Sequence, residues 1–245
     1  MIPRLLPFLA SFALCHADSL TLKNGESLQG ELVDTQANFV LLRLPETEGE
    51  ATRRIAPLQI ETLSFSDTDA PLEQQALKRA KFQSLLSEAD ARILLDYLDE
   101  LQSAGHPLTA LAYAKLWHPK NNYPQLDPSY REQLINSSLA AGLPEEALVH
   151  AQNWIKRSPA PTDHALPWIV QAEHQLKTEN LEAALWTSLT PLAYASRELS
   201  PHRQTLQQIA SHAYQRLGYD EHAQAYASPD PAPKSPLVLD PQSSP

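Results

Sequence analysis

An alanine that returns at a nearly fixed interval constrains the fold of this chain more than any other feature. The matching stretches are GHPLTALAYA with Ala110, GLPEEALVHA with Ala147, ENLEAALWTS with Ala184 and GYDEHAQAYA with Ala223. These alanines lie 37, 37 and 39 residues apart, and Ala76 precedes the first of them by 34 residues. Repeats of about this length are typical of helical solenoids, in which each unit buries its apolar face against its neighbours.

Each period contains two amphipathic helices. Apolar residues recur at helical spacing in 91–104 and again in 107–117, and Gly105 separates the two segments. Small side chains on a buried helix face allow neighbouring helices to approach closely, so we expect the recurring alanines at helix crossings. In the third unit, Pro191 is expected to kink or end a helix.

One stretch, 142–159, has a turn glycine, an alanine five positions later, a second small residue four further on and a closing proline: Gly142, Ala147, Ala151 and Pro159. This pattern resembles the tetratricopeptide repeat, and the resemblance extends over residues 70–227. It implies an all-α solenoid of antiparallel helix hairpins. It also implies a protein or peptide ligand in the concave groove of the array.

In tetratricopeptide arrays the first helix of each unit lines this groove, and the resemblance transfers the role to twelve positions. The candidate protein-binding groove residues are Arg92, Asp99, Gln102, Glu132, Asn136, Leu139, Ile169, Glu173, Lys177, Gln208, His212 and Arg216. The first helices depart from the family at Leu98 and Ile135, where a small residue is usual. The twelve positions lack the lysine and asparagine clamp with which some relatives grip a chaperone's terminal carboxylate, so that ligand is disfavoured. Individually, each position also fits an ordinary solvated helix face.

A different pattern precedes the repeats. Residues 19–65 alternate apolar and polar side chains in five short runs, and Asn24–Gly25 supplies a hairpin turn. Five strands in so short a segment predict a small curled sheet or barrel. The leucine-rich first strand, the NG turn, the glycine of the next strand and the final IAPLQIETLSF resemble the Sm-like or SH3-like barrels. We therefore expect a five-stranded small β-barrel over 18–66.

Some barrels of this kind bind RNA, but the charge of this chain opposes such a role. Four basic residues stand against eight acidic residues in 18–61, and the whole chain has a formal net charge of −10. A phosphate backbone is repelled by this mean charge unless a strong basic patch compensates. Nucleic-acid binding through the barrel is therefore a disfavoured alternative.

The first seventeen residues, MIPRLLPFLASFALCHA, combine one basic residue, an apolar run over 5–15 and a small residue at the end. This arrangement is typical of a secretory signal peptide, and the run is shorter than the roughly 18–20 apolar residues of a membrane span. We expect cleavage after Ala17 and a periplasmic or secreted protein. Lipid attachment at Cys15 is disfavoured, because Leu14 stands where that signal needs a small residue. The mature chain would then contain no cysteine and no disulfide.

The expected organisation is a signal peptide at 1–17, a small barrel at 18–66, helical repeats at 70–227 and a tail at 228–245. The last nineteen residues contain six prolines, which predicts that the tail is disordered.

Signals for catalysis are missing from the sequence. It contains no HExxH motif, no pair of histidines three or four positions apart, no GxSxG motif and no glycine-rich phosphate loop. We therefore expect no catalytic residues, no cofactor and no metal. The predicted function is a non-catalytic scaffold or adaptor of the bacterial cell envelope that binds a protein or peptide. The alternative is an envelope enzyme, or an enzyme's accessory subunit, whose active-site residues are dispersed in the sequence.

Overall fold

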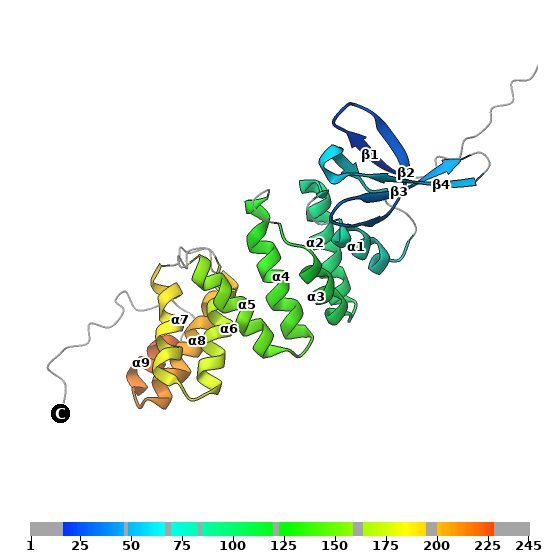
Figure 1. The fold of residues 1–245 in the computed structure, drawn as a ribbon. Helices are drawn as coiled ribbons and strands as arrows, with labels where there is room; N and C mark the ends of the chain where they lie inside the picture. Colours follow the sequence, from blue (N-terminus) through cyan, green and yellow to red (C-terminus); the bar gives the residue numbers. More distant parts are fainter. Residues whose placement is uncertain are drawn as a thin grey trace, which may run out of the picture. The chain divides into compact units, whose positions relative to one another are not determined.

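The computed structural model describes residues 17–46, 49–66, 70–82, 85–119, 123–158, 164–194 and 200–227 (Figure 1). The chain divides into two compact units, one ending at Tyr97 and one beginning at Leu98. The predicted signal peptide, except Ala17, and the predicted disordered tail lie outside the described residues.

The first unit begins with a five-stranded antiparallel sheet. Its strands are β1 (Asp18–Leu22), β2 (Ser27–Thr35), β3 (Val40–Glu46), β4 (Gly49–Ile55) and β5 (Ile60–Ser64), in the order β4-β3-β2-β1-β5. The five predicted strands are thus confirmed. Within the described residues, β4 and β5 are the two edges and do not pair with each other. The sheet is therefore open where the sequence predicts a closed barrel.

The alternation read from the sequence places one face of the sheet in the core. The buried side chains of the strands are Leu20, Leu22, Leu32, Val40, Leu42, Ile55, Ile60 and Leu63. At Gly30 the strands β2 and β3 approach so closely that a Cβ atom would lie 2.2 Å from the carbonyl oxygen of Arg43. This close approach explains the glycine inside a strand.

Helices make up most of the remaining described residues. They are α1 (Leu72–Lys81), α2 (Glu88–Ser103), α3 (Pro107–Leu116), α4 (Asp127–Ala140), α5 (Pro144–Arg157), α6 (Leu166–Lys177), α7 (Leu181–Tyr194), α8 (Ser200–Arg216) and α9 (Asp220–Ala227). Short 3₁₀ turns lie at Pro57–Gln59 and Pro124–Leu126. In the second unit, consecutive helices from α3 to α9 pack against each other. The chain is therefore a sheet followed by a helical region.

The four turns within the predicted repeats share one geometry. Gly105, Gly142, Glu179 and Gly218 all have positive φ, between 65° and 87°. In each turn the next residue donates its N–H to a carbonyl five positions earlier, for example Leu143 to Ser138 at 2.9 Å. These are the bonds of a Schellman motif, which ends a helix and reverses the chain. Glu179 adopts the same conformation although it is not a glycine. The backbone conformation of the turn therefore recurs at all four positions, whereas the residue type recurs at three.

The recurring alanines are buried, as predicted. Ala76, Ala110, Ala147 and Ala184 have no exposed surface, and Ala223 is 7% exposed. Ala147 belongs to a core cluster with Ile135 of α4 and Val170 of α6. A methyl group at this position thus lies where three helices meet. Pro191 lies inside α7, which continues past it to Tyr194, so the proline does not end the helix at its own position.

Replacing a buried alanine with leucine tests the helix crossings. Ala147→Leu and Ala184→Leu add three carbons at closely packed positions, so each should lower the free energy of unfolding by about 1–3 kcal/mol. Ala141, which caps the end of α4 and is only half-buried, provides a control of the same residue type. Thermal melts of the three variants should show a clear loss at 147 and 184 and little change at 141. Three equal, small effects would contradict the crossing positions.

Candidate functional site

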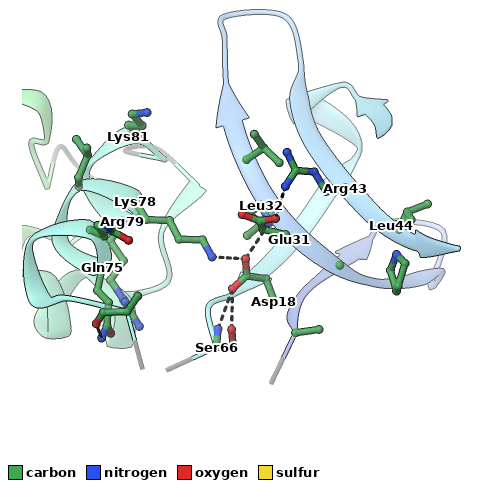
Figure 2. Close-up of a pocket in the computed structure, with 17 residues that line it drawn as sticks. Asp18, Glu31, Leu32, Arg43, Leu44, Ser66, Gln75, Lys78, Arg79 and Lys81 are labelled. Atoms are coloured by element: carbon green, nitrogen blue, oxygen red, sulfur yellow. Dashed lines mark hydrogen bonds and ion pairs between the residues drawn. The ribbon is translucent and has the colours of Figure 1, made fainter. Parts of the chain in front are cut away.

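The first unit contains an open pocket of about 570 Å³ between α1 and the sheet (Figure 2). Residues of β1, β2 and β3 line one side, and residues of α1 line the other. A volume of this size lies within the usual range of small-molecule sites, about 300–1,000 Å³. The pocket is thus large enough to hold a ligand, and its side chains determine what kind.

Asp18, the first residue of β1, is a buried and extensively bonded side chain of the pocket. It is only 1% exposed, and its carboxylate accepts hydrogen bonds from the N–H of Leu32 at 2.8 Å and the N–H of Ser66 at 2.9 Å. The hydroxyl of Ser66 donates a third bond at 3.1 Å, and the ammonium of Lys78 forms an ion pair (Figure 2). One carboxylate therefore joins β2, the residues after β5, and α1.

Arg79 is the second buried charge of this unit, with 1% exposure. Its guanidinium carbon lies 5.3 Å from the ring centroid of Phe65 and 5.1 Å from that of Tyr97, within cation–π range. The carboxylate of Asp90 lies 3.7 Å from Arg79 Nε and accepts a hydrogen bond from the hydroxyl of Ser87 at 2.6 Å. Arg79 thereby packs α1 against α2 and against Phe65, which directly follows β5.

These two buried charges were not among the sequence candidates. An aspartate directly before an alternating strand and an arginine inside an amphipathic helix each fit an exposed position, so their types gave no signal. Only the tertiary contacts show that Asp18 and Arg79 are interior. Their bonds make them structural residues that shape the pocket.

The predicted groove residues lie on α2, α4, α6 and α8, the first helices of the successive pairs. Of those in the second unit, Asp99, Leu139, Glu173, Lys177, Gln208, His212 and Arg216 are exposed, and Gln102, Glu132 and Asn136 are half-buried. Arg92 belongs to the first unit and is exposed. One assignment does not fit, because Ile169 is 6% exposed and packs in a core cluster with Leu206 and Ile209.

Several of the groove candidates already bind other parts of the chain. Gln102 Oε1 accepts a hydrogen bond from the hydroxyl of Ser137 at 3.1 Å, which joins α2 to α4. Arg216 pairs with Glu179 and donates to the carbonyl of Leu176 at 3.2 Å. Arg92 pairs with Glu88 on its own helix at 2.6 Å. These contacts give Gln102 and Arg216 a structural role between helices in addition to any role in binding.

A titratable cluster lies between α3 and α5 in the second unit. Lys115 pairs with Glu146, and His150 Nε2 lies 3.5 Å from Glu146 Oε1. Burial lowers the pKa of His150, and the neighbouring Glu146 carboxylate only partly offsets this effect. The ion pair with Lys115 lowers the pKa of Glu146. His150 therefore favours its neutral form in the folded chain.

Other signals of function are limited. In the ranges that the structure describes, no group of three or more His, Cys, Asp or Glu side chains could hold a metal ion. Within the same ranges, no helix has the length and apolar character to cross a membrane. No family model matches the chain, and no curated protein matches it.

Removing the Asp18 carboxylate should unfold the first unit selectively. Asp18→Ala leaves the Lys78 ammonium and the N–H groups of Leu32 and Ser66 without their acceptor, and we expect a loss of about 3–5 kcal/mol. Glu31→Gln breaks the exposed pair with Arg43 instead and should cost less than about 1 kcal/mol. Hydrogen exchange of β1 and β2 amides measures the effect directly.

All four tryptophans lie beyond residue 98, so their fluorescence reports the second unit separately. Equal losses in the two variants would contradict this role of Asp18.

The stability of the second unit should decrease as the pH falls from 7.5 to 5. The lowered pKa of His150 means that the unfolded chain binds its proton more tightly than the folded chain does. Acidification through the ordinary histidine range, down to the lowered pKa, therefore favours unfolding. Urea titrations followed by tryptophan fluorescence should show a weaker pH dependence in His150→Gln. His212→Gln, at an exposed position of α8, is the matched control. An unchanged pH dependence in His150→Gln would contradict the assignment.

Proposed function

We propose that this protein is a non-catalytic scaffold of the bacterial cell envelope that binds a protein or peptide along its helical region. The proposal includes the assignment of residues 70–227 to tetratricopeptide-like repeats and a relation of the sheet to Sm-like or SH3-like barrels. It also includes export with cleavage after Ala17. The ligand-binding side chains are those of the first helices, without Ile169.

One observation carries this proposal, namely the repetition of the helix hairpin. The turns at Gly105, Gly142, Glu179 and Gly218 share their backbone conformation, and a buried alanine follows each of them by five residues. Stacked hairpins of this kind form extended surfaces on which a partner can contact several units at once. Along the second unit, exposed polar residues of the first helices supply such a surface.

Charge-matched variants test the binding surface. Asn136→Lys with Gln208→Lys adds two positive charges to the first helices α4 and α8. Gln152→Lys with Gln224→Lys adds the same charge to exposed positions of the second helices α5 and α9. Proteins captured from the native envelope by the wild-type chain and by both variants are compared by quantitative mass spectrometry. The protein that the wild-type chain enriches most is then purified, and its dissociation constants for the wild-type chain and for both variants are measured.

The first-helix variant should bind this partner at least tenfold more weakly, equivalent to about 1.4 kcal/mol, whereas the control should bind normally. Equal binding by both variants would exclude the first helices as the contact surface. N-terminal sequencing of the recovered protein tests the export part independently. The expected first residue is Asp18, and a cytosolic chain that keeps Met1 would contradict export.

A further inference from the structure

Apolar residues contribute to both sides of the pocket in the first unit. Val33, Leu44, Pro45 and Leu77 line it, with Leu44 and Pro45 on β3 and Leu77 on α1. Leu44 and Leu77 are half-buried, so part of each residue remains accessible. Burying such surface against a ligand is favourable by roughly 25 cal/mol per Å². The pocket thus offers an apolar body a place to bind.

Cationic side chains outnumber anionic side chains in the lining of the pocket. Four cationic residues line it, Arg43, Lys78, Arg79 and Lys81, against two carboxylates, Asp18 and Glu31. From 18 to 97 the chain has fourteen acidic and eight basic residues, so half of the basic residues of this unit gather at one pocket. The lining of the pocket thus carries an excess of positive charge, whereas the rest of the unit carries an excess of negative charge.

Both carboxylates of the pocket are engaged by other groups. Asp18 is buried under four donors, and Glu31 pairs with Arg43 at 2.8 Å. The ammonium of Lys78 is different, because its side chain is 26% exposed and a lysine has three N–H donors, of which the Asp18 pair needs one. Lys81 follows one turn later on α1 and is exposed, and it makes no ion pair within the described residues. The pocket therefore presents hydrogen-bond donors to a ligand.

From this arrangement we infer that the pocket binds a small amphiphilic anion, with an acidic head at Lys78 and Lys81 and an apolar chain against Leu44 and Leu77. Lys78 stays paired with Asp18 on one side and uses its remaining donors on the other. Figure 2 shows Lys78 reaching from α1 toward Asp18, with Leu44 on the sheet side. This site is independent of the proposed scaffold function, because it lies in the first unit and uses none of the groove residues.

Octanoate is a suitable probe, and octylammonium is its control with a similar chain and the opposite charge. Amide spectra of the ¹⁵N-labelled chain are recorded during titration with each compound. Octanoate should produce saturable shifts at the amides of Val33, Leu44 and Leu77, and octylammonium should not. Lys81→Gln and Leu44→Ser should each weaken octanoate binding about three- to fivefold, because each removes one contact of modest strength. Lys156→Gln, which removes an exposed charge on α5, should leave the affinity unchanged.

Three results would overturn the inference. Similar affinities for octanoate and octylammonium would show that the pocket does not select an anion. Octanoate shifts confined to other parts of the chain, or no saturable shift, would show that this pocket is not the site. Unchanged octanoate affinity in both Lys81→Gln and Leu44→Ser would show that these side chains do not contact the probe. None of these readouts depends on a protein partner, so the scaffold proposal is tested separately.

Discussion

The buried carboxylate of Asp18 is the interaction on which the first unit most depends. Strand β1 lies between β2 and β5, and the Asp18 side chain extends this pairing beyond the start of the strand by accepting the N–H groups of Leu32 and Ser66. Lys78 adds α1 to the same carboxylate. A buried charge is costly unless it is paired, so removing any one of these partners should destabilise the first unit. Arg79 then fixes the other side of α1 by packing between Phe65 and Tyr97.

The second unit is held together by a different principle. Consecutive helices from α3 to α9 pack against each other, and the same turn conformation recurs at Gly105, Gly142, Glu179 and Gly218. Small side chains contribute to these contacts, as Ala147 and Ala151 do in the cluster with Ile135 and Val170. Polar contacts supplement this packing at particular places, such as the Gln102–Ser137 bond between α2 and α4. In the helical array proposed above, each hairpin depends mainly on its neighbours. A mutation such as Ala184→Leu should therefore disturb nearby hairpins first.

These two principles explain what the sequence could predict. Periodic features have a direct sequence signal, and the strands, the helix pairs and the burial of Ala110, Ala147 and Ala184 were all predicted from spacing. The open sheet was not, because closure depends on whether β4 and β5 meet, and alternation within each strand carries no information about this. Ile169 was misassigned for a related reason. A register transferred by family resemblance gives its place on the helix, whereas its burial depends on the Leu206 and Ile209 side chains that cover it.

The pocket illustrates a further limit of sequence reasoning. Its cationic side chains come from β3 and from α1, and they are separated by more than thirty positions in the chain. Read locally, Lys78, Arg79 and Lys81 are the basic last turn of an amphipathic helix, where cations favourably oppose the helix dipole. In the folded chain the three side chains have different environments. Arg79 is buried, Lys78 pairs with Asp18, and Lys81 is exposed. Three similar residues thus acquire three different roles, and only Lys78 and Lys81 remain accessible to a ligand.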